Sequence, residues 1–128
     1  MWSITGRRLS RLRAADKTEC GFRVVEGQQP GLRSRWSHGV AETLPGCVRF
    51  RPGLGGGIRI ARPGQPWLPL DLVEVSRATE RTAGLKESWS VSDSARILLV
   101  RTPTALLEWA VVREHRDWAL SRVRPPNM

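Results

Sequence analysis

Short alternations of apolar and polar residues run along most of this chain. In the segment 19–25, the side chains of Cys20, Phe22 and Val24 fall on one face, and the segment 47–51 repeats the pattern. A period of two over four to eight residues is typical of a half-buried β-strand. The same alternation, or an apolar run of strand length, marks five further segments: 35–42, 58–61, 70–78, 95–101 and 105–112.

The last segment with a clear pattern follows these strands. Residues 113–123 are predicted to form a short amphipathic helix with Trp118 on its buried face, flanked by Leu120 or Ser121. The helix must end before Pro125. No alternation of strands with helices exists to build a parallel sheet. The predicted fold class is therefore all-β with one C-terminal helix, and we expect that helix to lie across the open end of a curled sheet with Trp118 as its apolar plug.

The inward positions of these elements predict a hydrophobic core. The runs 97–100 and 105–112 are apolar on both faces, so their facing stays open. The predicted core consists of Phe22, Val24, Trp36, Val40, Val48, Phe50, Ile58, Ile60, Val75, Leu98, Val100, Leu107, Trp109, Trp118 and Val123.

The size and composition are those of one folded domain. The chain has 128 residues, of which 40% are hydrophobic and 26% charged. Its boundaries are predicted as a basic flexible segment 1–18, a domain 19–124 and a tail 125–128. The sequence contains no apolar run of 18 residues and its start lacks the apolar core of a signal peptide, so we expect a cytoplasmic location, with the inner face of the cell membrane as an alternative.

Positive charge is concentrated in the first half. Residues 1–66 contain 12 basic and 4 acidic residues, a net of +8, whereas residues 67–128 contain 9 and 8, a net of +1. Such a field favours anionic partners such as lipid head groups or nucleic acid. Because 19 of the 21 basic residues are arginine, the alternative is a GC-rich genome that encodes its cations in this way.

The residues of reactive type do not form a catalytic or metal-binding pattern. Cys20 and Cys47 have no further ligand at metal spacing, and two reduced thiols on strands are expected. The glycine-rich segment 52–57 lacks the Lys-Ser/Thr ending of a phosphate loop. The spacing of Asp71 and Glu74 does not distinguish them from surface carboxylates. We therefore expect no enzyme activity, no cofactor and no metal.

Six short motifs occur in an order that resembles one protein family. They are Glu19-Cys-Gly-Phe-Arg-Val, Trp36-Ser-His-Gly-Val, Val48-Arg-Phe-Arg-Pro, Leu72-Val-Glu-Val-Ser, Ile97-Leu-Leu-Val-Arg and Leu106-Leu-Glu-Trp-Ala, followed by the Trp118 helix. Together they resemble an uncharacterised family of small actinobacterial membrane proteins with a pleckstrin-homology-like domain. The resemblance implies a split barrel of about seven antiparallel strands capped by the helix, and its motifs include no catalytic residue.

The family pattern also sets an expectation for the start of the chain. Members begin with a transmembrane helix and a basic stretch; here the stretch 7–13 is present without a preceding apolar helix. The protein is then either a variant without the anchor, or the start given lies inside the true reading frame.

Two functional predictions follow. The first is a non-catalytic module at the membrane surface, in which basic residues hold anionic groups, as in lipid-binding pleckstrin-homology domains: Arg7, Arg8, Arg11, Arg13, Arg23, Arg33 and Arg35. The alternative is a protein-interaction module that takes a peptide against the strand 70–77 beside Arg113 and Arg116. Trp67 and Trp89 are either exposed anchors for a partner or partly buried under loops. Nucleic-acid binding ranks last, because Trp36 and Phe50 are expected in the core.

Overall fold

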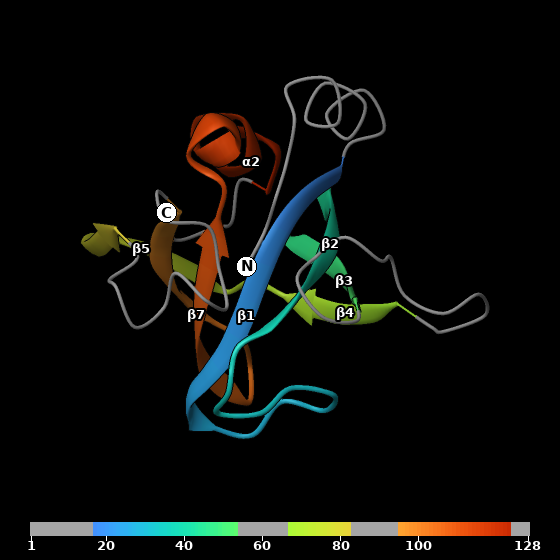
Figure 1. Ribbon diagram of the computed structural model, residues 1–128. Helices are drawn as coiled ribbons and strands as arrows, with labels where there is room; N and C mark the ends of the chain where they lie inside the picture. The colour runs from blue at the N-terminus through green and yellow to red at the C-terminus, as the bar shows by residue number, and fades with distance from the viewer. Residues whose placement is uncertain (1–16, 54–66, 83–94, 124–128) are drawn as a thin grey trace.

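The computed structural model describes residues 17–53, 67–82 and 95–123. These residues form seven strands, a 3₁₀ turn and one α-helix (Figure 1). The elements are β1 (Lys17–Gly27), β2 (Ser37–Leu44), β3 (Cys47–Pro52), β4 (Leu68–Asp71), β5 (Glu74–Thr82), β6 (Arg96–Arg101), β7 (Ala105–Val111), η1 (Arg113–His115) and α2 (Arg116–Val123). All paired strands are antiparallel, in the order β4-β3-β2-β1-β7-β6-β5. The predicted fold class is confirmed: the curled sheet with its C-terminal helix has the architecture of a pleckstrin-homology-like split barrel.

Strand β1 lies at the centre of the sheet and belongs to both of its halves. Its first part pairs with β2 from Lys17 to Phe22, and Cys20 to Gly27 pair with β7. The register with β7 shifts between Val24 and Glu26, which is the mark of a β-bulge. Val25 is the extra residue at this shift, and it is 47% exposed.

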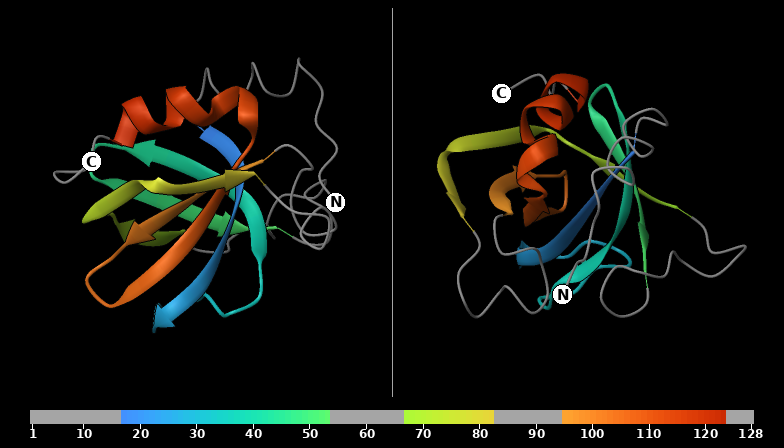
Figure 2. Two further views of the ribbon diagram at one scale, coloured as in Figure 1. Left: turned by 90° about the vertical axis from the view of Figure 1, so that its left-hand side faces the viewer. Right: turned by 45° about the horizontal axis from the view of Figure 1, so that its top comes forward.

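The two edge strands, β4 and β5, are joined directly. Only Leu72 and Val73 lie between them, so the sheet curls until its opposite edges meet at this corner (Figure 2). The Leu72 amide donates to Gly46 O at 3.0 Å, and the Val73 amide donates to Arg101 O at 2.8 Å. The prediction of one strand over 70–78 is therefore wrong. The chain breaks at the point where its alternation slips, because Val73 and Glu74 are both exposed between buried Leu72 and Val75.

Three aromatic rings from different strands meet in the core. Phe22 of β1 contacts Phe50 of β3 edge to face at 5.0 Å and stacks on Trp109 of β7 at 5.7 Å, with 2° between the ring planes. All three side chains are fully buried. Aromatic pairs in these geometries are favourable beyond their apolar burial. The cluster therefore packs the two halves of the sheet against each other.

The helix α2 lies across one end of the curled sheet (Figures 1 and 2). Its buried residues are Ala119, Leu120 and Val123. Trp118 packs against the core only in part and contacts the His115 ring at 5.4 Å. The prediction of a covering helix is confirmed, but Trp118 is not its main plug. Trp118 lies beside the face of α2 that Ala119, Leu120 and Val123 bury.

Most of the predicted core is buried in the part of the chain that the structure describes. Val24 and Trp36, like Trp118, are only partly buried, and Ile58 and Ile60 lie outside the described residues. Ile97 and Ala110 face away from Leu98 and Trp109 yet are also buried, so β6 and β7 are covered on both faces at this end. Leu99 and Leu106, on the same face as Ile97 and Ala110, are only partly buried. The predicted residues that are buried are Phe22, Val40, Val48, Phe50, Val75, Leu98, Val100, Leu107, Trp109 and Val123.

Candidate functional site

The arginines predicted to bind anions do not form one site in the described structure. Arg7, Arg8, Arg11 and Arg13 lie outside the described residues. The Arg23 Nη2 atom pairs with a carboxylate oxygen of Glu108 on β7 at 2.6 Å. The predicted role of Arg23 thus requires it to leave an existing carboxylate partner.

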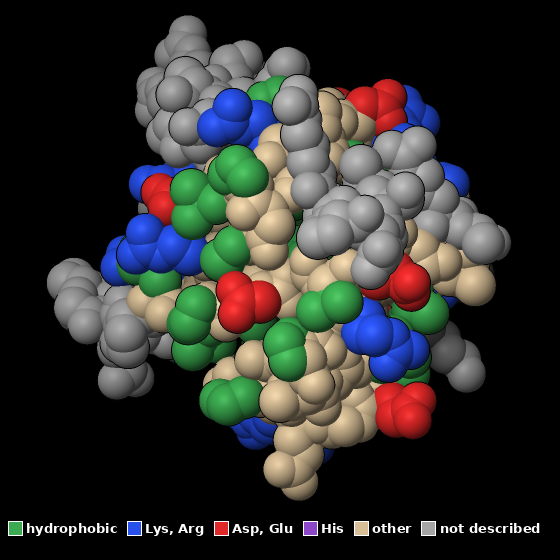
Figure 3. All heavy atoms as spheres, turned by 180° about the vertical axis from the view of Figure 1, so that it is seen from behind, with side chains coloured by type: hydrophobic (Ala, Val, Ile, Leu, Met, Phe, Trp, Pro, Cys, Tyr) green, Lys and Arg blue, Asp and Glu red, His purple; other side chains and the backbone are tan. Residues whose placement is uncertain are grey.

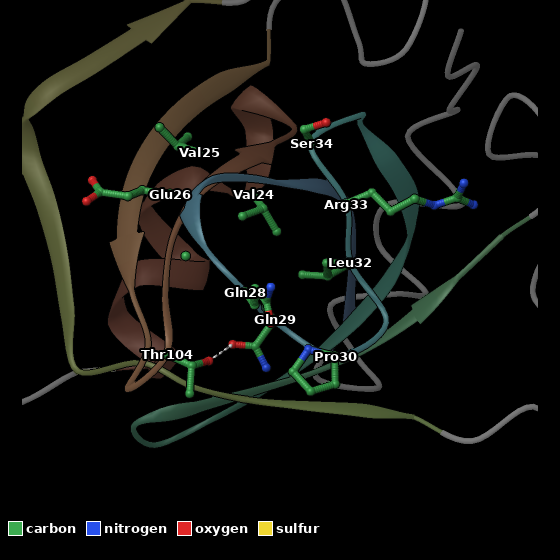
Figure 4. A pocket seen from close by; sticks show the side chains of 11 residues that line it. Val24, Val25, Glu26, Gln28, Gln29, Pro30, Leu32, Arg33, Ser34 and Thr104 are labelled. Atoms are coloured by element: carbon green, nitrogen blue, oxygen red, sulfur yellow. Dashed lines mark hydrogen bonds between the residues drawn. The ribbon is translucent and has the colours of Figure 1, made fainter.

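Arg33 and Arg35 lie in the exposed β1–β2 loop, at the end of the barrel away from α2 (Figure 1). This loop borders an open depression of about 1020 Å³. Val24 and Leu32 point into the space, whereas Arg33 and Glu26 point away from it (Figure 4). The depression is therefore apolar at its centre, and the predicted cations do not converge in it.

A different group of cations surrounds Trp67, just before β4. The Arg51 guanidinium carbon lies 4.4 Å from the centre of the Trp67 ring, the Lys17 Nζ atom at 5.6 Å and the Arg49 guanidinium carbon at 5.9 Å. All three are within the range of cation–π attraction. We call Lys17, Arg49, Arg51 and Trp67 the Trp67 cluster.

The strand registers explain why these residues meet. Val48 and Phe50 of β3 are buried, so Arg49 projects from the opposite, outer face. The pairing of Phe50 with Leu68 brings Trp67 beside Arg51. Lys17 lies two strands away on β1. It pairs with Glu42 of β2, which pairs in turn with Arg49 of β3, so the three side chains form one row across the sheet. The cluster therefore crosses the outer face of the β1–β4 half of the sheet.

The charges of the cluster are only partly balanced. Arg49 pairs with Glu42 at 3.1 Å. In the described ranges no carboxylate pairs with Lys17 or Arg51, and the buried Nε of Arg51 has no hydrogen-bond partner. Lys and Arg side chains gather on the β2–β4 side of the molecule (left in Figure 3). This side therefore presents positive charge next to an indole ring.

The wall predicted for peptide binding is not assembled as expected. The segment 70–77 is divided between two edge strands. Arg116 is hydrogen-bonded to Glu80 of β5 and, at 2.5 Å, to Asp117, which occupies its guanidinium. Arg113 is exposed on η1. The peptide hypothesis thus loses one of the two cations on which it depended.

Glu80 joins α2 to the sheet. Besides Arg116, it accepts a hydrogen bond from Arg96 Nε at 2.7 Å, and its side chain is 8% exposed. Burial acts to raise the pKa of Glu80, but the hydrogen bonds from Arg116 and Arg96 outweigh it, so the pKa lies below the ordinary value of 4.5. The folded state therefore favours the carboxylate form.

We predict that Glu80→Gln lowers the free energy of unfolding at pH 7 by about 1–2 kcal/mol. The expected loss is smaller than for a fully buried ion pair, because Arg96 and Arg116 are partly exposed and solvent screens their charges. The ionised Glu80 carboxylate stabilises the fold fully at pH values above about 4.5, its ordinary pKa in the unfolded chain. This stabilisation is lost as the pH falls through the lower pKa that Glu80 has in the folded protein. Urea unfolding across this pH range should show a steeper loss for the wild type than for the variant. Glu26→Gln, at an exposed position near the end of β1, is the control. Parallel pH profiles for wild type and Glu80→Gln would contradict this assignment.

Neither cysteine is poised for chemistry. Both are free, as predicted, and burial raises the pKa of the Cys20 thiol and of the Cys47 thiol. Among the described residues, no group of three His, Cys, Asp or Glu side chains is placed to hold a metal ion. In the same ranges, no helix has the length and apolar character needed to cross a bilayer.

The Trp67 cluster was only partly foreseeable. The alternation in 47–51 does place Arg49 and Arg51 opposite the core, and Trp67 is half-buried, in line with the expectation of partial burial. The pairing that joins them to Lys17 depends on strands distant in sequence. Trp89 lies outside the described residues. No protein family, curated protein or solved structure matches the chain, so the family resemblance stays a prediction.

Proposed function

We propose that this domain is a non-catalytic module that binds the anionic inner surface of the cell membrane through the Trp67 cluster. The observation that supports the proposal is the gathering of three cations around one half-buried tryptophan, two of them without a carboxylate partner in the described structure. A cation near an anionic leaflet contributes about 1 kcal/mol. Tryptophan favours the head-group region, where its ring meets apolar chains and its N–H meets water.

The shape of the site suits a surface better than a small ligand. The cluster residues come from β1, β3 and the position just before β4, and they lie on the outer face of the sheet. Side chains on one sheet face can approach a flat array of head groups together. The apolar depression beside the β1–β2 loop lacks such converging cations. The membrane surface is therefore the anionic partner that this geometry supports best.

Sedimentation with lipid vesicles tests the proposal. Three cations at about 1 kcal/mol each predict a partition coefficient about 100-fold higher on anionic than on neutral vesicles at low salt. Binding should weaken as salt rises from about 0.05 to 0.5 M, because screening shortens the reach of each charge. An absence of sedimentation at low salt would reject membrane association. Preferential binding of a single-stranded oligonucleotide under the same conditions would assign the basic face to nucleic acid instead.

A further inference from the structure

We infer that the Trp67 cluster recognises a phosphomonoester dianion presented by a membrane lipid, as in phosphatidic acid. The inference rests on the proposed membrane association and specifies the head group. It depends on the number of unpaired charges in the cluster, on the donors of Arg51, and on the position of Lys17 at the same ring.

The charge of the cluster matches a dianion. Of its three cations, Arg49 is bonded to Glu42, which leaves Lys17 and Arg51 without an ion-pair partner in the described part of the chain. A phosphomonoester carries about −1.5 to −2 charges at neutral pH. A phosphodiester such as phosphatidylglycerol carries one. Only the monoester balances both unpaired cations with one group.

The donors of Arg51 match phosphate oxygens. The guanidinium lies against the Trp67 ring at 4.4 Å, so the ring fixes its position from one side. Its Nε has no hydrogen-bond partner among the described residues. A guanidinium presents its N–H groups as a planar fork that binds two phosphate oxygens at once. A bound phosphate group would give the Arg51 Nε an acceptor that the described fold does not supply.

Lys17 supplies the second charge from another strand. Its ammonium lies 5.6 Å from the centre of the ring on which Arg51 packs. A monoester has three terminal oxygens, so it can accept from the arginine fork and from an ammonium together. A diester has two such oxygens and offers less to the second cation. The pair of Arg51 and Lys17 therefore favours the monoester by both charge and number of acceptors.

The test compares vesicles containing phosphatidic acid with vesicles containing phosphatidylglycerol, in mixtures adjusted to the same surface potential. We expect about tenfold tighter binding to phosphatidic acid, because one additional charge-assisted hydrogen bond is gained. Arg51→Lys keeps the charge but removes the fork, so it should bind both vesicles nearly equally. Arg33→Lys, the matched change in the loop, should keep the tenfold preference.

The outcomes separate the two proposals. Equal binding of the wild type to both lipids would overturn the phosphomonoester inference and leave membrane association intact, whereas binding to neither would overturn both. Full preference in Arg51→Lys would also overturn the inference.

Soluble glycerol 3-phosphate distinguishes a lipid from a free ligand. We expect it to displace the protein from phosphatidic acid only at millimolar concentration, because it lacks the surface potential that attracts the other cations. Displacement at micromolar concentration would assign the site to a soluble phosphomonoester and overturn the lipid source.

Discussion

Trp109→Ala is expected to lower the free energy of unfolding by about 3–5 kcal/mol, the range for emptying a large aromatic site in a packed core. Trp109 is fully buried, stacks on Phe22 and lies opposite Leu98 of β6. Its removal opens a cavity where the two halves of the sheet meet, and neighbouring strands cannot close it without moving the backbone. Urea unfolding followed by far-UV circular dichroism measures the loss.

Trp118→Ala serves as the control, because it removes the same side chain from a half-buried position on α2. Its cost should be clearly smaller than that of Trp109→Ala. If the two substitutions cost the same, or if Trp118→Ala costs more, the helix rather than the aromatic stack would be the main source of stability at this end of the barrel.

The strand pattern could be predicted because it is local. The alternation around Phe22 and around Phe50 places both side chains inward without knowledge of their neighbours. The helix after β7 could be predicted for the same reason, since its spacing and the prolines beyond it are local signals. The rotation of that helix about its axis could not be predicted, because it depends on how α2 packs on the sheet. Trp118 is therefore less deeply buried than the sequence pattern predicts.

The corner between β4 and β5 was missed because its cause is non-local. Leu72 and Val73 look like part of a strand that continues from Leu70. Their amides instead bond to Gly46 and Arg101, which are far away in the chain. A pattern of side chains gives no information on which partners the backbone finds.

The surroundings of the candidate cations could not be predicted for a similar reason. Arg23 looked available in the sequence, but its carboxylate partner, Glu108, lies on β7. The opposite holds for Arg51, which meets Trp67 only because β3 pairs with β4. The positive half of the chain is visible in the sequence, whereas the strand registers decide which of its cations are left without a carboxylate.

The membrane proposal depends on position rather than net charge, and a pair of double variants separates the two. Lys17→Gln with Arg51→Gln and Arg33→Gln with Arg35→Gln each remove two positive charges. The first pair removes the unpaired cations of the Trp67 cluster. The second alters exposed residues of the β1–β2 loop. Lys17 and Arg51 are only partly exposed. Unchanged unfolding midpoints would confirm that each variant is folded.

The most direct measurement is the partition coefficient of these two double variants on anionic vesicles at low salt. Loss of two cations at about 1 kcal/mol each predicts a decrease of about 30-fold for Lys17→Gln with Arg51→Gln. The partition coefficient of the loop variant should fall by less than about threefold, because only a weak long-range attraction to the loop cations remains after screening by salt. Equal losses in the two variants would mean that binding follows net charge alone, and a larger loss in the loop variant would move the site to the β1–β2 loop and contradict the Trp67 cluster as the binding surface.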